Sequence, residues 1–222
     1  MTTSTIKRLL LTLVFFSAAL PFFCAGTFSV GLKYFGLSVH PKGAVNASLM
    51  PLKLDKNGIF VFNLGASANA EYFIWRDIVS VKAVQAFYSD CIGQFAGFSH
   101  IGFRARIFKI GSFSLNGGIG PTFIYRKNWY KVPGYDDAFS FFYGEKDDEW
   151  QHRFLWYGGE FEFNYLIARS TELSFSVIPG GFDLINFSLG VRYNIPKKHR
   201  HPDKNVSRET FLNEQSAGSS NF

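Results

Sequence analysis

The sequence has few cysteines and, beyond residue 26, no apolar run long enough for a membrane-spanning helix. Two cysteines cannot make a disulfide-rich scaffold, and a bundle of membrane helices is excluded because each helix needs about 20 apolar residues. The formal net charge of +6 is diffuse and gives no reason to expect a nucleic-acid partner. Stability must therefore come from a closed, hydrogen-bonded fold.

The N-terminus has the composition of a secretory signal peptide. A basic start precedes an apolar run from Leu9, and small residues follow up to Gly26. We expect residues 1–26 to be cleaved on export. A retained membrane helix is the alternative, but Pro21 interrupts a run that is already short for a span. Cleavage leaves Cys91 as the one cysteine, so we expect no intramolecular disulfide.

Aromatic residues and glycine are abundant, with 27 Phe, 10 Tyr, 4 Trp and 21 Gly, and the apolar residues alternate with polar ones. In residues 59–73 the even positions are apolar, and the odd positions from Asn63 are polar or small. The same period of two recurs in 113–129 and 158–167. A soluble β-sandwich could alternate too, but would seldom collect glutamates and arginines on one face and so many aromatics on the other. This pattern predicts a β-barrel in lipid.

Strand counting predicts an all-β fold, an eight-stranded antiparallel transmembrane β-barrel in up-and-down order. Short segments typical of tight hairpins lie at 55–58, 109–112 and 168–171, and they alternate with longer links at 40–43, 76–95, 131–150 and 179–183. Such alternation is typical of periplasmic turns and extracellular loops. The predicted strands are 27–39, 44–54, 59–75, 96–108, 112–130, 151–167, 172–178 and 184–195.

Residues 78–88 could form a ninth strand. An odd number would place the long acidic loop at 131–150 inside and the C-terminus outside. Parity therefore favours a loop or a strand extension at 78–88.

The last predicted strand carries a recognisable signal. In FSLGVRYNI (187–195), Ser188, Gly190, Tyr193 and Ile195 stand at offsets that resemble the terminal β-signal of bacterial outer-membrane proteins. The resemblance implies recognition by the barrel-assembly machinery. The domain at 27–195 is also similar in organisation to small OmpA-, OmpX- and OmpW-type barrels, which implies an outer-membrane location with the C-terminus in the periplasm.

The chain departs from that pattern after the β-signal, which normally lies at or very near the end. Pro196 stops the strand, and the remaining residues are polar and basic. We expect residues 196–222 to be a disordered periplasmic tail.

Strand parity predicts which polar side chains face the barrel interior. An eight-stranded barrel is just wide enough for side chains to fill it, so we expect a salt-bridged plug. A narrow anion-leaning conduit, or a gate made by an ion-pair switch, is the alternative. The predicted inward residues are the five cations Lys33, Arg104, Arg106, Arg126 and Arg192, the three anions Glu71, Glu160 and Glu162, and His100, Asn116, Asn164 and Asn186.

Candidate catalytic residues are sparse. Nucleophilic catalysis needs a serine and a histidine within hydrogen-bond reach and a third group that orients the base. Ser99 and His100 are adjacent and would face opposite sides of a strand. His40, Ser89 and Asp90 could meet at the outer rim only through folding. The acidic residues of 131–150 lack the regular spacing of a calcium loop, and we expect neither a metal nor a cofactor.

Together these features predict a monomeric, non-enzymatic surface protein. It would act in membrane integrity, adhesion or contact with a host or an extracellular ligand through its loops. Its other partners would be outer-membrane lipid and the barrel-assembly machinery. A lipid-modifying enzyme and a narrow channel for small or hydrophobic solutes are the alternatives.

Overall fold

The computed structural model describes residues 28–136, 141–179 and 184–195. These residues form a closed barrel of eight antiparallel strands in sequence order, as predicted. The strands are β1 (Phe28–Val39), β2 (Phe60–Trp75), β3 (Val79–Ser89), β4 (Phe95–Ile110), β5 (Phe113–Lys127), β6 (Trp150–Ala168), β7 (Thr171–Pro179) and β8 (Ile185–Ile195). The expected signal peptide (1–26) and tail (196–222) lie outside the described residues.

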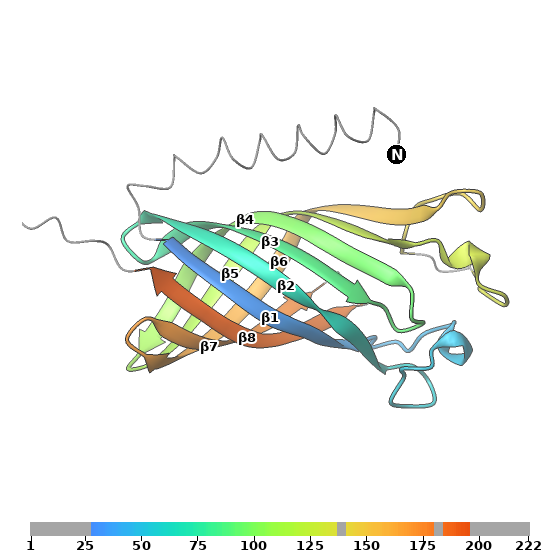
Figure 1. Ribbon diagram of the computed structural model, residues 1–222, viewed down its shortest axis with the longest axis horizontal. Coiled ribbons are helices and arrows are strands. Elements are labelled where there is room, and N and C mark those ends of the chain that lie inside the picture. Colours follow the sequence, from blue (N-terminus) through green and yellow to red (C-terminus); the bar gives the residue numbers. More distant parts are fainter. Residues whose placement is uncertain (1–27, 137–140, 180–183, 196–222) are drawn as a thin grey trace, which may run out of the picture.

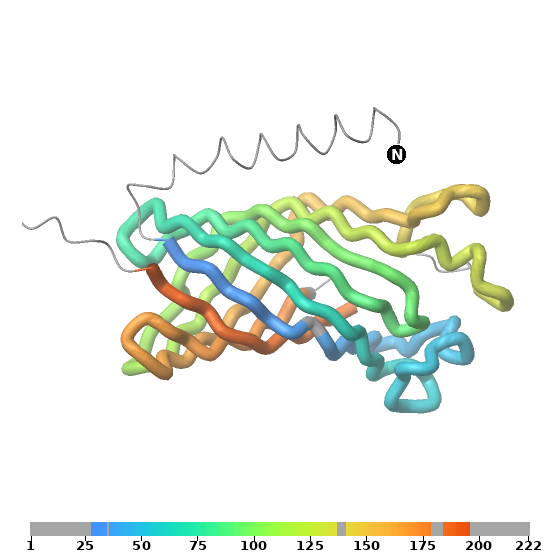
Figure 2. Tube along the Cα trace, viewed as in Figure 1, coloured from blue at the N-terminus to red at the C-terminus, as the bar shows by residue number. Residues whose placement is uncertain are grey.

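The barrel has a turn end and a loop end. Figure 1 shows tilted strands around one barrel, and in Figure 2 the described chain starts and finishes at the same end. The turn end has the short connections at 76–78, 111–112 and 169–170. The loop end has the connections at 40–59, 90–94, 128–149 and 180–184. No helix among the described residues is long and apolar enough to cross a membrane.

Two strand predictions were wrong. One predicted strand is a loop and one predicted loop or strand extension is a strand, so the total of eight strands is still correct. Residues 44–54 are a loop with a short 3₁₀ helix, η2 (Ala47–Leu49), and only Lys53 makes a bridge, to Val61. The expected hairpin at 55–58 therefore lies at the loop end. Residues 79–89 are strand β3, entered through a tight turn in which Arg76 takes a left-handed φ of 50°. Non-glycine residues seldom adopt that conformation, so the sequence does not signal this turn.

The barrel closes through its last strand. Strand β8 pairs with β1 in antiparallel register, from Phe28 opposite Ile195 to Val39 opposite Ile185. This pairing removes the free edge that lipid would not tolerate. Ser188 and Arg192 are buried inside, whereas Leu189, Val191 and Tyr193 are exposed outside.

The distribution of polarity is inverted relative to a soluble protein. The outer wall exposes large apolar residues on every strand, among them Leu32, Leu64, Phe87, Ile101, Ile119, Phe161, Leu173 and Val191. The residues that are fully buried are mostly polar, including Gln151, Glu71, Glu162 and Asn164. An apolar exterior around a polar interior is the arrangement that a lipid bilayer requires of a spanning barrel.

Candidate functional site

The middle of the barrel holds an interior charge cluster, in which buried glutamates and cations contact one another. Lys82 Nζ lies 2.5 Å from both Glu160 Oε2 and Glu162 Oε2. Lys33 Nζ lies 3.4 Å from Glu160 and 3.5 Å from Glu162. The cluster consists of Lys33, Lys82, Arg104 and Arg192 with Glu71, Glu160, Glu162 and Glu172.

The arginines connect the other strands to this centre. Arg104 pairs with Glu71 and places Nη2 3.2 Å from Glu162 Oε2. Arg192 Nη2 lies 2.7 Å from Glu71 Oε2, and its Nη1 lies 3.1 Å from Glu172 Oε2. The cluster therefore ties together β1, β2, β3, β4, β6, β7 and β8.

Serine hydroxyls complete the coordination of the buried carboxylates. Ser174 Oγ donates to Glu162 over 2.7 Å, and Ser176 Oγ donates to Glu160 over 2.6 Å. Ser29 Oγ donates to Glu71 over 3.2 Å, and Ser80 donates to the same carboxylate. A buried charge is costly unless it is paired and hydrogen-bonded, and each glutamate of this group meets both conditions.

The charge count differs from the sequence-based one. Lys82 falls in the stretch predicted to be a loop or a strand extension, but it lies in the cluster because 79–89 is a strand, and it is buried. Arg106 pairs with exposed Asp77 over 2.8 Å near the turn end instead. With Glu172 added, four cations face four anions, so the formal charges of the cluster itself balance.

Arg126 lies apart from the cluster, in an aromatic clamp. Its guanidinium carbon is 3.8 Å from the Trp129 ring centroid and 4.1 Å from that of Phe142. Its Nε donates to Gln151 Oε1 over 2.9 Å. Both rings come from the β5–β6 connection, so these cation–π contacts hold that connection over the barrel mouth.

An apolar layer fills the interior between the charge cluster and the loop end. Ala86, Phe98 and Ile124 are buried there, and Phe141 and Phe142 of the β5–β6 connection pack against them. On the side of this layer that faces the charge cluster, the imidazole Nδ1 of His100 lies 2.7 Å from Thr122 Oγ1. Asn116 and Asn164 are buried, and Asn186 accepts a hydrogen bond from Ser38 Oγ near the loop end. The described interior is thus filled by side chains.

Three loop-end connections build a second hydrophobic core, which we call the loop core. Met50, Val61, Cys91 and Trp129 are buried in it, with Ala44, Ile92 and Tyr135 packed around them. These residues come from 40–59, the start of β2, 90–94 and 128–136. Trp129 therefore belongs to the loop core, whereas Trp75, Trp150 and Trp156 are exposed on the outside, where interfacial aromatics of membrane barrels lie.

Asp90 and Asn46 fasten the loop core. Asp90 Oδ1 accepts from the backbone N–H groups of Ile92 and Gln94, and its Oδ2 accepts from Trp129 Nε1 over 2.7 Å. Burial raises the pKa of Asp90, and these hydrogen bonds oppose that rise. Asn46 exchanges two hydrogen bonds with the backbone of Asp136, over 2.9 and 2.8 Å.

Two of the three candidate catalytic residues, Asp90 and His40, make hydrogen bonds within the loop end. Both oxygens of Asp90 are occupied as described above, and His40 uses its backbone N–H to bind the carbonyl of Ile59. Burial lowers the pKa of His40. Within the described part of the chain, no side-chain hydrogen bond joins His40, Ser89 and Asp90. The described residues also contain no group of three or more His, Cys, Asp or Glu side chains that could hold a metal ion.

The four β-signal positions lie along β8. Ser188 is buried inside the barrel, and Tyr193 and Ile195 are exposed on the outer wall. A Cβ at Gly190 would overlap the carbonyl of Leu32 and the Cα of Lys33 on β1. Glycine at 190 thus permits the close approach of the two strands that close the barrel.

No protein-family model and no curated protein matches the chain. Similar solved structures include Ail, the attachment invasion locus protein of Yersinia pestis, crystallised with the heparin analogue sucrose octasulfate. It is 15% identical, the match covers 77% of this chain and 99% of Ail, and the TM-score is 0.44.

Two further solved structures resemble the chain to a similar degree. The N-terminal β-barrel domain of Pseudomonas aeruginosa OprF is 14% identical over 77% of this chain and 99% of that one, with a TM-score of 0.41. Neisserial surface protein A (NspA) is 11% identical over 77% and 98%, with a TM-score of 0.42. The chain is thus similar to small outer-membrane β-barrels, and the predicted fold, a closed, eight-stranded antiparallel barrel, is confirmed by its own strand order.

Proposed function

We propose that this chain is an outer-membrane surface protein whose barrel is sealed and whose loop core presents a recognition surface outside the cell. The loop core is the observation that carries this proposal. A connection that served only to join strands would be solvated and polar, whereas these three bury Trp129, Met50 and Cys91 together. Order of this kind lowers the entropy that a binding surface loses when it meets a partner.

The charge of the β5–β6 connection indicates the kind of partner. Residues 131–149 carry six acidic and two basic side chains, a net charge of −4. Exposed Glu145 and Asp148 lie on this connection, whose aromatic Tyr143 is also exposed. Complementarity favours a cationic patch on a host protein or other extracellular protein over a polyanion.

The interior supports the sealed state. A balanced charge cluster and an apolar layer occupy it in series, and an aqueous channel generally needs many more than eight strands. We infer that assembly proceeds through the β-signal on β8 and that the turn end faces the periplasm, with the barrel acting as a monomer.

Adhesion of proteoliposomes tests the proposal. Vesicles carrying the refolded barrel should bind monolayers of cultured epithelial cells, and replacing residues 141–148 by a short Gly-Ser linker should abolish binding. The matched control is a Gly-Ser replacement of 169–170 at the turn end, which changes Arg169 to glycine and should leave binding unchanged. Equal binding by empty vesicles, or by the 141–148 variant, would refute the recognition role.

Conductance tests the sealed interior separately. The refolded barrel should add no steady current in planar bilayers. A stable single-channel current from the intact chain would show that the interior conducts and would support the channel alternative.

A further inference from the structure

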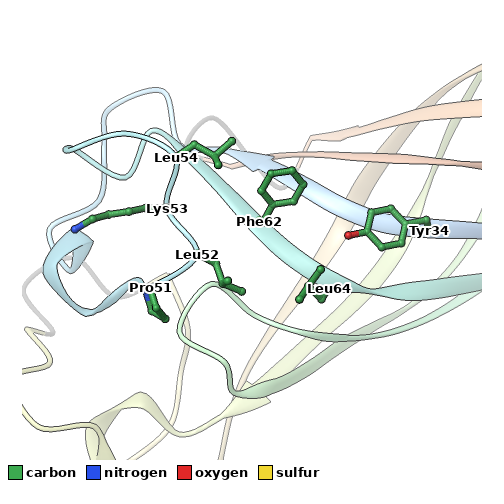
Figure 3. Close-up of a pocket in the computed structure, with 7 residues that line it drawn as sticks. All are labelled: Tyr34, Pro51, Leu52, Lys53, Leu54, Phe62 and Leu64. Atoms are coloured by element: carbon green, nitrogen blue, oxygen red, sulfur yellow. The ribbon is translucent and has the colours of Figure 1, made fainter.

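The groove beside the β1–β2 connection is apolar. Segment 52–54 pairs with the edge of β2 beyond the end of β3, through two backbone hydrogen bonds of 2.8 and 2.9 Å beside Phe60 and Phe62. Between this segment and Leu64 of the outer wall lies a hollow of about 420 Å³, which Figure 3 shows. Lys53 lines it, but its ammonium donates to a backbone carbonyl of the same connection over 2.6 Å. The groove therefore offers a ligand mainly hydrocarbon contact.

Two arginines at the barrel mouth, by contrast, have no acidic partner in the described part of the chain. Arg126 of β5 is buried, and Arg153 of β6 lies in the same row as buried Gln151 and Leu155, which packs against the apolar layer. Alternate residues of a strand share a face, so this row points into the barrel. Neither guanidinium forms an ion pair with a carboxylate, whereas each cation of the interior charge cluster contacts at least one glutamate.

The two arginines are close neighbours on the inner face of the sheet. Arg126 pairs in register with Gln151, and Ile124 pairs with Arg153, two residues further along each strand. Arg126 and Arg153 are therefore diagonal cross-strand neighbours, which are typically about 7–8 Å apart. Two like charges at this separation repel each other, and an anion between them would turn that repulsion into attraction.

Aromatic rings cover the flat faces of both guanidiniums. Arg126 lies between two rings, as described above, and the guanidinium carbon of Arg153 is 4.5 Å from the Tyr143 ring centroid and 5.1 Å from that of Phe141. Such stacking uses the faces of a guanidinium, whereas its five N–H donors point outward in its plane. The rings thus orient the donors without occupying them.

Hydrogen-bond donors outnumber acceptors at this place. Gln151 Oε1 accepts from Arg126 Nε over 2.9 Å and from the Trp129 backbone N–H over 3.3 Å, and the Tyr135 hydroxyl lies 3.4 Å from Arg126 Nη2. Buried Gln151 Nε2 and Arg153 Nε find no hydrogen-bond partner among the described residues. An unpaired buried donor destabilises the fold, so this surplus indicates an acceptor that the described chain does not supply.

The position of the arginines decides where such an acceptor would come from. Their row faces the interior, so the barrel wall separates it from the phosphates of surrounding lipid. Part of the Arg153 side chain is exposed, so solvent can reach it. The apolar layer around Phe98 and Ile124 lies next to it, so an ion that enters from the loop end would stop at the mouth.

We propose that the barrel mouth is a binding site for a soluble tetrahedral dianion of the phosphate or sulfate type, which bridges Arg126 and Arg153 and accepts from Gln151. A guanidinium binds two oxygens of such an ion with two parallel N–H donors. A dianion balances both charges, whereas a carboxylate balances one. The inference is independent of what the loop core recognises, and it needs no conduction through the barrel.

Calorimetric titration with inorganic phosphate tests the site. The refolded barrel in octyl glucoside, a detergent without phosphate, should bind one phosphate per barrel at pH 8 and constant ionic strength. Arg153→Gln should weaken binding by about tenfold or more, because it removes a pair of charge-assisted hydrogen bonds. Arg153→Lys keeps the charge without the paired donors, so its affinity should be intermediate.

Matched controls separate this site from a general effect of salt. Arg106→Gln removes an arginine near the turn end and should leave the phosphate affinity unchanged. Sulfate should compete with phosphate, and acetate at the same ionic strength should not. Heat-modifiable gel migration verifies folding of each variant. The proposal would be overturned by the absence of saturable phosphate binding, by unchanged affinity in Arg153→Gln or Arg153→Lys, or by acetate that competes as well as sulfate.

Discussion

Removing the charge of Glu162 should destabilise the barrel more than any other single change in the interior charge cluster. This carboxylate lies 3.5 Å from Lys33, 2.5 Å from Lys82 and 3.2 Å from Arg104, and it accepts from Ser174. Glu162→Gln keeps one acceptor oxygen but turns an amide N–H₂ towards ammonium and guanidinium groups. Four cations would then face three anions in a closed interior.

The expected loss in the free energy of unfolding is about 3–5 kcal/mol, the cost of leaving a buried charge without its partner. A urea titration of the barrel refolded into vesicles measures it, with tryptophan fluorescence and the heat-modifiable band as two independent signals. Asp77→Asn is the control. It breaks the exposed pair with Arg106 and should cost less than about 1 kcal/mol.

A double variant separates electrostatic pairing from simple loss of fit. Lys82→Met together with Glu162→Gln leaves three cations and three anions in the cluster, so its cost should be smaller than the sum of the single costs by about 2 kcal/mol. The reasoning is refuted if Glu162→Gln costs less than about 1 kcal/mol or if the two substitutions prove additive.

Further predictions concern closure, the aromatic clamp, the buried thiol and the tail. Gly190→Ala should prevent closure, because its Cβ would meet the β1 backbone, and the heat-modifiable folded band should disappear. Arg126→Ala should release the β5–β6 connection and raise its cleavage rate in limited proteolysis, whereas a rate equal to that of the unchanged chain would contradict the clamp. Burial raises the pKa of Cys91 to about 12, so at pH 8 in a Cys24→Ser chain iodoacetamide should modify it at least about 100-fold more slowly in the folded than in the unfolded state; equal rates would show an accessible thiol. Truncation after Ile195 should leave a barrel that refolds, and failure to refold would show that the assembly signal had been misread.

The period of two was sufficient to predict which face of most strands points inward. Phe161 and Tyr165 are exposed and Glu160 and Glu162 are buried, as their alternation indicates, because neighbouring residues of a strand must point to opposite faces of the wall. The identity of the buried side chains on β6 could therefore be predicted. Their partners could not, because a pair such as Lys33 and Glu160 is 127 residues apart and meets only through closure.

The two wrong strand predictions lie where the sequence does not indicate the backbone conformation. Because 44–54 was counted as a strand, parity placed 78–88, and with it Lys82, in a loop or a strand extension. The turn at 76–78 contains no glycine, since Arg76 takes the left-handed φ, so it gave no signal against that count. Segment 44–54 has the apolar content of a strand, but Pro51 lacks the N–H that a strand ladder needs. Only the tertiary structure shows that 52–54 pairs with the overhanging edge of β2.

The sequence by itself determined that this chain is a closed, lipid-facing barrel, because alternation, the lack of helical spans and the lack of disulfides leave few other ways to satisfy its backbone in a membrane. The tertiary structure alone decided that the charges of the interior charge cluster balance, that three connections share the loop core around Trp129, and that a groove forms beside Leu64. Each of these depends on register and on contacts between distant strands, which a local pattern does not encode.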